Sequence, residues 1–529
     1  MAVYLKEFST HSEYDAYING SGAILPNVSI CTTEEDVHYN PYISVTSVSL
    51  DKHSITIQEG GSDTLIATVL PANATNKNVI WSSSNNWVAT VTSGGVVTVV
   101  STGSCIITVT TVDGEYTDTC ELSVKSNRVI TYTATEKLTE TQFSSAYEGL
   151  HVNEFSGTSG QRLRMYYHTF SNGTGTITFN SDVASIGEYA FYKCSGLTSI
   201  AIPDSVTTIG NSAFSDCSGL TSINIPSGVT SIGNYVFSSC NSLLVEDNLR
   251  YADTYLVGAS DKTLSSYTIK SGTRWIGENA FNNCTSLTSI DIPDSVTSIR
   301  VRAFSNCSGL TSINIPSGVT SISNYTFKGC SGLTSIDIPD SVTSIGMSAF
   351  ENCYSLTSID IPSGVTSIGE SAFYNCSGLT GTLTIPSGVT SIGAFAFNDC
   401  ENLSGSIIIP NGVTVINNGV FRGCSSVTSF TIPNAVTRIG DESFMYCSGI
   451  TSIDIPSTVT SIGEGAFLTC KSLVSVICRP TTPPTGGHST TFAGNASGRK
   501  IYVPADSVNA YKTDSGWWSF WKNSIEAIQ

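Results

Sequence analysis

The sequence lacks long apolar runs: no stretch of about 18 consecutive apolar residues occurs among its 529 residues, so we expect no membrane insertion. Charge is scarce too. Only 12% of the residues are charged, and 42 acidic side chains outnumber 24 basic ones, for a net charge of −18. This balance argues against nucleic acid and anionic membranes as partners. The N-terminus also lacks a basic start followed by an apolar run, so we expect either a removed signal segment or release without secretion.

Motifs for catalysis and for metal binding are missing as well. All six histidines lie outside residues 194–470. No phosphate-binding glycine loop and no strained nucleophile turn occurs, and no Cys-x-x-Cys pair is available for zinc. The sequence therefore predicts a protein that is not an enzyme and that carries no cofactor.

What the sequence does contain is a repeat of about 23 residues, clearest at residues 333–353. A fixed period of this size predicts a solenoid, in which stacked coils share one long core. Twelve cysteines occupy the same repeat position, where we expect a ladder of small, buried and unpaired thiols. These cysteines are Cys194, Cys217, Cys240, Cys284, Cys307, Cys330, Cys353, Cys376, Cys400, Cys424, Cys447 and Cys470.

Each copy begins with apolar residues that alternate with polar ones and then opens to a wider spacing. This pattern predicts one short strand per coil, followed by a turning arm. In the clearest copy, Leu333, Ile336 and Ile338 would point inward, whereas Ser335 and Asp337 would point outward, because successive side chains of a strand alternate between its faces.

The repeats, written Leu-x-x-Ile-x-Ile-Pro-x-x-Val-x-x-Ile-x-x-x-Ala-Phe-x-x-Cys, resemble the BspA-like class of bacterial leucine-rich repeats. The ending at residues 500–511 resembles the terminal segment of that family. The resemblance implies a leucine-rich-repeat solenoid of the kind found on surface proteins of gut and oral bacteria. We expect a linker and N-terminal cap at residues 126–178, the repeats at 179–478 and a C-terminal cap at 479–529. The final Trp517, Trp518, Phe520 and Trp521 would fold over the last coil, with a sugar-stacking platform as the alternative.

Residues 43–125 alternate in short apolar bursts separated by glycine-containing turns, which predicts a β-sandwich. The sequence at residues 70–75 and 79–85 resembles that of the group 2 bacterial immunoglobulin-like domain. Such domains usually act as spacers in cell-surface and virion proteins. Cys105 and Cys120 lie on two predicted strands joined by a turn at residues 113–114, and a disulfide between them stays open because the register is not fixed by the sequence.

Residues 1–42 read as a small α+β module. The stretch at residues 26–41 resembles N-terminal pieces of structural proteins from phages and prophages of Bacteroidales, which implies attachment to other virion or surface proteins. The alternative is a plain strand and helix packed on the next domain. The expected fold is thus mostly β: a leucine-rich-repeat solenoid preceded by an immunoglobulin-like β-sandwich and this N-terminal module.

One interval between repeat cysteines is 44 residues long, and the piece inserted there, residues 245–257, reads as a hairpin. Insertions in repeat proteins map to loops on one face, often the binding face. Aromatic and cationic residues gather around this hairpin, and we take them as candidate binding residues, with a degenerate repeat that has core aromatics as the alternative. They are Arg250, Tyr251, Tyr255, Arg274 and Trp275.

The outward residues of the predicted strands form a second candidate surface of hydroxyls and carboxylates, which includes Asp291, Asp337 and Asp360. Asp337 and Asp360 would lie one coil apart, at about 5 Å, and could share a calcium ion. The alternative is that these carboxylates are only solvated.

These patterns favour a non-enzymatic protein for surface display and adhesion. The first hypothesis is a fibre or decoration protein on the surface of a phage virion, anchored through residues 1–42 and presenting the solenoid to host glycans or mucus. The alternative is an extracellular BspA-like adhesin of the bacterial cell surface that binds host matrix proteins. The partners would be protein or glycan ligands in either case.

Overall fold

The structure, a computed structural model, describes residues 42–138, 155–157 and 165–529. The predicted N-terminal module therefore lies outside the described residues, apart from Tyr42. Contacts divide the chain into two compact units. We call them the sandwich unit, which runs to Val129 and includes Phe179–Val183, and the solenoid unit, which holds the remaining residues. Among the described residues, no helix is long and apolar enough to cross a membrane.

The sandwich unit confirms the predicted immunoglobulin-like fold. Its larger sheet has the order β2-β9-β8-β5, a second sheet has the order β3-β7-β6, and β1 pairs with β4. Alternate residues of these strands point inward and form one apolar core. The strands are β1 (Ser47–Leu50), β2 (Ser54–Gln58), β3 (Ser62–Thr64), β4 (Ala67–Leu70), β5 (Val79–Ser83), β6 (Ala89–Val91), β7 (Val96–Val99), β8 (Gly103–Thr111) and β9 (Thr117–Lys125).

Cys105 and Cys120 lie on the adjacent strands β8 and β9, but they are not opposite each other. Cys105 is opposite Leu122, and Cys120 is opposite Ile107. Both side chains are buried free thiols in the sandwich core. The disulfide that the sequence left open is therefore absent, and the diagonal register is the physical reason.

The solenoid unit opens with a strand that runs against the repeats. β10 (Val129–Ala134) pairs antiparallel with β15 (Leu197–Ala201), which is the first strand of the regular stack. Covering this end satisfies a strand edge that would otherwise be free to pair with another chain. The other early strands are β11 (Phe155–Gly157), β12 (Met165–Ser171), β13 (Thr174–Phe179) and β14 (Val183–Ile186).

The repeats form two parallel strand stacks, whereas the sequence predicted one strand per coil. The first stack uses the predicted alternating segment and is interrupted in the central coils. Its strands are β15, β17 (Ser222–Asn224), β22 (Ser266–Thr268), β24 (Ser289–Asp291), β30 (Gly405–Ile408), β32 (Val427–Thr431), β34 (Ser452–Ile455) and β36 (Ser475–Cys478).

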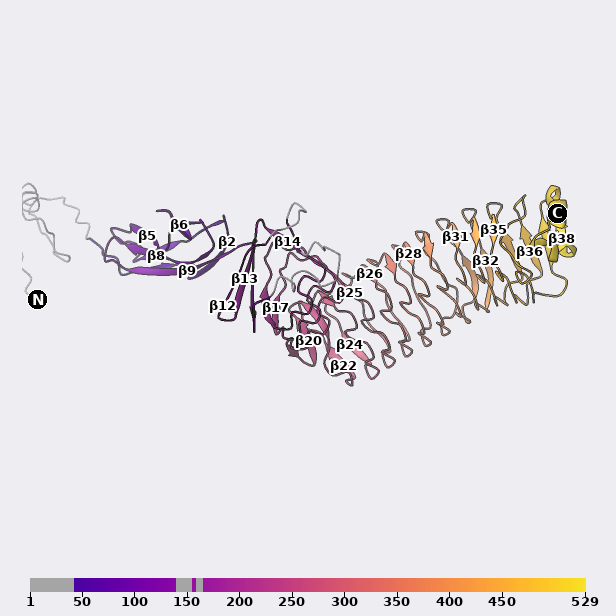
Figure 1. Cartoon of the computed structure of the whole chain (residues 1–529), viewed down its shortest axis with the longest axis horizontal. Helices are drawn as coiled ribbons and strands as arrows, with labels where there is room; N and C mark the ends of the chain where they lie inside the picture. Colours follow the sequence, from indigo (N-terminus) through magenta and orange to yellow (C-terminus); the bar gives the residue numbers. More distant parts are fainter. Residues whose placement is uncertain (1–41, 139–154, 158–164) are drawn as a thin grey trace, which may run out of the picture. The chain divides into compact units, whose positions relative to one another are not determined.

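The second stack lies after the proline of each coil, at an Ile that the sequence analysis assigned to the arm. Figure 1 shows β26, β28, β31 and β35 following one another along the solenoid unit. The prediction of one strand was incomplete because two paired residues are too few to show a period of two. These short strands are β16 (Thr208–Ile209), β18 (Ser231–Ile232), β25 (Ser298–Ile299), β26 (Ser321–Ile322), β27 (Ser344–Ile345), β28 (Ser367–Ile368), β29 (Ser391–Ile392), β31 (Val415–Ile416), β33 (Arg438–Ile439) and β35 (Ser461–Ile462).

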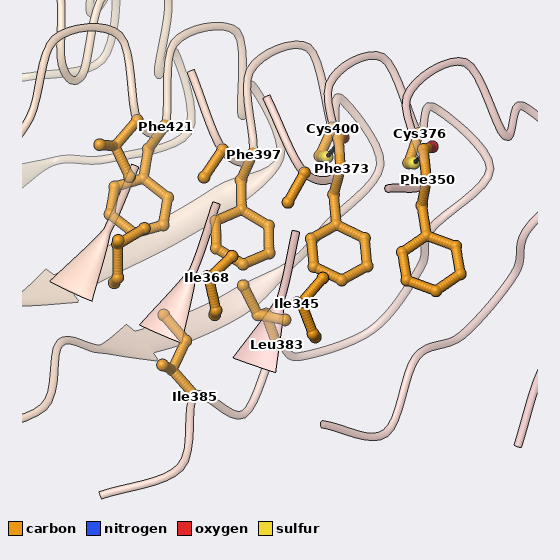
Figure 2. Packing of buried hydrophobic residues seen from close by; sticks show 14 of the residues in the cluster. Ile345, Phe350, Ile368, Phe373, Cys376, Leu383, Ile385, Phe397, Cys400 and Phe421 are labelled. Atoms are coloured by element: carbon orange, nitrogen blue, oxygen red, sulfur yellow. Dashed lines mark hydrogen bonds between the residues drawn. The ribbon is translucent and has the colours of Figure 1, made fainter. Parts of the chain in front are cut away.

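Two ladders run through the core of the solenoid unit. The phenylalanines of successive arms stack almost parallel, as Phe350 and Phe373 do at 5.2 Å between ring centroids and 5° between planes. Ten of the twelve repeat thiols donate to the carbonyl oxygen of the phenylalanine in the preceding coil, as Cys376 Sγ does to Phe350 O at 3.0 Å (Figure 2). All twelve repeat cysteines are buried and free, which confirms the predicted ladder and adds this hydrogen bond to it.

The arm is a run of consecutive turns that requires left-handed backbone at two positions per coil. In the copy closed by Cys353 these are Ser348, with φ 51°, and Asn352, with φ 64°. The position before the cysteine favours Asn, Asp or Gly, the residue types that enter this region at least cost. Eight of the twelve positions follow this preference: Asp216, Asn283, Asn306, Gly329, Asn352, Asn375, Asp399 and Gly423. The other four, which are also left-handed, are Lys193, Ser239, Tyr446 and Thr469.

The C-terminal residues close the last coil. The strands β37 (Lys500–Val503) and β38 (Ile525–Ala527) extend the sheet β34-β36. Between them lie η1 (Ala505–Ser507), α3 (Val508–Thr513), η2 (Trp517–Phe520) and η3 (Lys522–Ser524). Trp517 and Trp518 are buried, and both indole Nε1 atoms donate to Pro484 O. These two rings therefore pack as a cap and are not available as a sugar-stacking platform.

Phe373→Ala tests the phenylalanine ladder. Removing this fully buried ring should lower the free energy of unfolding by about 3–5 kcal/mol, because a cavity replaces contacts with both neighbouring rings. Urea unfolding followed by circular dichroism measures the change. Phe520→Ala is the matched control, since that side chain is exposed, and an equal shift in the two variants would contradict the ladder's role.

The buried thiols make stability depend on alkaline pH. Burial raises the pKa of the Cys330 and Cys376 thiols to about 12, above the value of about 8.5 in an unfolded chain. The folded state keeps these protons after the unfolded state has lost them, so the stabilisation is complete below about pH 8.5 and falls as pH rises toward 12. Each thiol contributes a loss of about 1.4 kcal/mol per pH unit in that range.

We expect the urea midpoint of the solenoid unit to fall steadily between about pH 8 and pH 10.5. Cys376→Ala should show a shallower pH dependence than the wild type, because one titrating thiol is gone. A midpoint that stays constant over this range would contradict the buried thiol ladder.

Candidate functional site

The inserted piece forms the predicted hairpin and joins the second strand stack. β19 (Val245–Glu246) pairs with β20 (Leu249–Ala252), and β20 pairs antiparallel with β21 (Tyr255–Ala259). β21 then pairs in parallel with β23 (Trp275–Ile276), so that Tyr255 lies opposite Trp275. The sheet that contains the hairpin has the order β19-β20-β21-β23-β25 and does not include β18. The second stack is therefore interrupted between β18 and the hairpin.

The aromatic members of the first candidate cluster lie in the core. Tyr251, Tyr255 and Trp275 are each no more than 3% exposed. They fill the space that smaller side chains occupy in regular coils, and they present no ring to a ligand. The degenerate-repeat alternative is therefore the one that the structure favours, and the prediction of an aromatic binding face at the hairpin is corrected.

The cationic members of the cluster also serve the fold. Arg274 donates to Ser227 O at 3.2 Å and to Val229 O at 2.7 Å, and its guanidinium lies 4.2 Å from the centre of the Trp275 ring. Arg250 is half-buried on β20, and its Nε atom has no hydrogen-bond partner among the described residues. Neither side chain extends freely from the hairpin.

A residue that the sequence analysis missed completes the repair of the interrupted stack. Arg300 donates from Nη2 to the carbonyl oxygens of Ile232 and Gly233. In regular coils the carbonyl equivalent to Ile232 O accepts a backbone N–H from the next coil, as Ile209 O does from Gly233 N. At Ile232 the Arg300 side chain thus replaces a backbone donor that the hairpin does not supply, and Arg274 adds hydrogen bonds to the same coil. The sequence contained one sign of this role: Arg300 follows Ser-Ile at the repeat position where most copies have glycine.

Arg300 also forms an ion pair with a deeply buried carboxylate. Its Nε atom lies 3.0 Å from Oε1 of Glu278, whose side chain is only 3% exposed. The other carboxylate oxygen accepts a hydrogen bond from the Tyr255 hydroxyl at 2.6 Å. Burial, together with the nearby Glu278 carboxylate, raises the pKa of Tyr255 well above its ordinary value. The three side chains form one closed polar network inside the solenoid unit.

The second candidate surface is exposed, as the sequence predicted. We call it the strand face: the outward residues that precede the proline of each coil. Asp291, Asp337 and Asp360 all lie on it and are exposed. In the central coils its members are Ser289, Asp291, Ser312, Asn314, Ser335, Asp337, Ser358 and Asp360.

A shallow, open hollow lies on the strand face between two of these coils. It is lined by Ser312, Ile313, Asn314, Ser335, Ile336 and Asp337. Here the first strand stack is reduced to a single isolated bridge between Asn314 and Asp337, whereas β34 and β36 pair over four residues. The hollow therefore lies in a part of the first stack where neighbouring strands are only loosely paired.

The carboxylates of the strand face do not form a metal site by themselves. Among the described residues, no group of three or more His, Cys, Asp or Glu side chains is placed to hold a metal ion. Calcium takes six to eight oxygen ligands. The predicted sharing of calcium by Asp337 and Asp360 therefore lacks further acidic ligands.

The comparisons with known proteins identify both folded parts. Residues 162–251, 259–380 and 379–483 match the family described as the BspA type leucine rich repeat region. The chain belongs to this family. Residues 44–122 match the bacterial Ig-like domain of group 2. The BspA-type repeats thus account for more than half of the chain, and the Ig-like domain precedes them.

Individual relatives match only short parts. Kappa-carrageenase of Pseudoalteromonas carrageenovora is 51% identical over 72 residues, which are 14% of this chain and 18% of the enzyme. An Ig-like virion protein of Serratia phage KSP90 is 43% identical over 83 residues, 16% of this chain and 32% of that protein. The chain thus spans less than two thirds of the length of either protein.

A crystal structure of a leucine-rich repeat protein from Bacteroides ovatus also resembles the chain. It is 28% identical, the match covers 68% of this chain and 90% of that one, and the TM-score is 0.43.

Arg300→Ala tests the repair of the interrupted stack. The variant leaves the Glu278 carboxylate buried without its cation, so the free energy of unfolding should fall by about 3–5 kcal/mol, measured by urea unfolding. Arg302→Ala is the matched control, because Arg302 is exposed and only lies over the Tyr325 ring. Glu278→Gln in the Arg300→Ala background should recover part of the loss, and no recovery would contradict the charge-pair argument.

Proposed function

We propose that this BspA-type protein is a non-enzymatic adhesion protein whose ligand-binding part is the strand face of the solenoid unit. The observation that carries the proposal is the repetition of exposed, short polar side chains on this face in coil after coil, while the repeat phenylalanines and thiols lie in the core. Repeated equivalent positions favour several weak contacts acting together, which is how avidity arises without a single deep pocket.

The chemistry of the buried groups supports a role without catalysis. A reactive cysteine needs an accessible thiolate, but burial raises the pKa of the repeat thiols, to about 12 at Cys330. The similarity to kappa-carrageenase spans only 18% of that enzyme, which suits a shared accessory segment better than a shared active site. We therefore attribute no carrageenase activity to this chain.

We propose a phage particle as the carrier of the protein. The similarity to an Ig-like virion protein supports this choice, as does the resemblance of residues 26–41 to structural proteins of Bacteroidales phages. In this proposal residues 1–42 attach to other virion proteins, and the strand face meets host glycans or mucus. The second candidate is a bacterial cell-surface adhesin that binds host matrix proteins, which the BspA-type repeats favour.

Immunogold electron microscopy of the source organism tests the carrier. With antibody raised against residues 179–478, we expect gold on phage particles, and serum pre-absorbed with the purified protein is the control. Gold on the bacterial envelope would replace the virion by the cell-surface candidate. Gold confined to the cell interior would contradict both forms of the proposal.

A further inference from the structure

We propose that the hollow on the strand face docks an arginine side chain of a basic partner protein. The inference deepens the proposed function and depends on it for its biological meaning. Of the protein and glycan ligands expected of an adhesion protein, it selects a protein of defined chemistry, and in this it departs from host glycans as the ligand of the strand face. The supporting observations are the lining of the hollow, the charge of the surrounding coils and an internal example of the same contact.

The lining of the hollow suits both parts of an arginine side chain. Ile313 and Ile336 form an apolar floor, 5% and 9% exposed, against which a methylene stem can pack. Asp337 and Asn314 stand at the rim with Ser312 and Ser335, and they offer oxygen acceptors to the N–H groups of a guanidinium. A bare metal ion would gain nothing from the apolar floor.

The chain itself shows how a guanidinium binds this face. Asp454 occupies, on β34, the strand-face position that Asp337 occupies in its own coil. It accepts two hydrogen bonds from Arg479, from Nε and from Nη2, both at 2.7 Å. Arg479 comes from the next coil, directly after β36. This paired, planar geometry is the one in which arginine binds carboxylates best.

The coil that carries Asp337 and the two coils after it have no cation that could play the part of Arg479. Lys328 of the preceding coil is paired with Glu351. Residues 329–421 contain no lysine or arginine. The same stretch holds seven carboxylates, and among the described residues Asp337 and Asp360 have no ion pair. The seven are Asp337, Asp340, Glu351, Asp360, Glu370, Asp399 and Glu401.

The excess of carboxylates over cations in these coils favours a basic partner protein. The negative field of several coils would draw a basic protein surface toward the strand face and exclude acidic ones. Asp360, one coil beyond Asp337, and Asp291, two coils before it, extend the same field along the face. One arginine would enter the hollow, and further basic side chains of the partner would meet these flanking carboxylates.

Fluorescence polarisation with the purified full chain tests the proposal. The probe is a fluorescein-labelled peptide of alternating glycine and arginine. The matched peptides carry citrulline, which has the shape of arginine without its charge, or lysine. We expect the arginine peptide to bind, the citrulline peptide not to bind, and the lysine peptide to bind more weakly. Asp337→Asn should weaken binding of the arginine peptide by roughly threefold at low salt, the effect of one exposed charge pair.

Two variants make the result specific to the hollow. Glu370→Gln removes one charge from an exposed site on a neighbouring arm and should leave the affinity nearly unchanged. Arg479→Gln frees the Asp454 carboxylate and should strengthen binding of the arginine peptide by creating a second docking point. All of these side chains are exposed, so the variants should fold. Equal weakening by Asp337→Asn and Glu370→Gln, or equal binding of the arginine and lysine peptides, would overturn the proposal.

The peptide assay and the localisation experiment can fail independently. Binding that depends on Asp337, combined with gold in the cell interior, would retain the arginine site and remove the adhesion function. Gold on a particle or envelope without peptide binding would retain the surface function and remove the arginine site.

Discussion

The fold depends on hydrogen bonds between neighbouring coils, and in most coils one of them comes from the cysteine thiol that closes the coil. The thiol of one coil donates to the phenylalanine carbonyl of the coil before it, whereas backbone N–H groups of the arm, such as Phe350 N, donate to carbonyl oxygens of the coil after it. These bonds fix each coil at one register relative to its neighbour. The rings then stack face to face because the backbone positions them so, and the continuous core follows. A coil without its neighbour would leave this whole set unpaired.

The hairpin shows what happens where that register is broken. The carbonyls left at the break are satisfied by Arg274 and Arg300, two long side chains that reach the place where a coil would have been. Arg300 is in turn neutralised by Glu278, so that no uncompensated charge stays in the interior. The hydrogen bonds of Arg274 and the burial of the aromatic rings give this composition a structural role.

Much of the fold could be predicted from the sequence, because periodicity records burial. The inward positions of Leu333 and Ile336, the buried thiols and the sandwich were all visible as patterns. The second strand stack was not visible in the sequence, because each of its strands has only two residues and cannot show the two-residue alternation of a strand. Local composition was also ambiguous at the hairpin: Tyr251 and Trp275 are equally suited to a core and to a binding face. Their burial in the structure decides between the two, since each is only 3% exposed. The hollow lies where the first strand stack is reduced to an isolated bridge, a feature of two neighbouring coils that no single coil's sequence shows.

Every coil has the same left-handed backbone before its cysteine, so one coil can replace another without a change in the path of the chain. Asn352 and Asn375 occupy equivalent places with nearly equal φ angles, and the cores behind them are built from the same residue types. A recombination event that adds or removes whole coils between such places joins surfaces that already fit. The number of strand-face positions can therefore change over evolutionary time in steps of one coil, without any new packing solution, and the length of the array becomes a heritable variable separate from its stability.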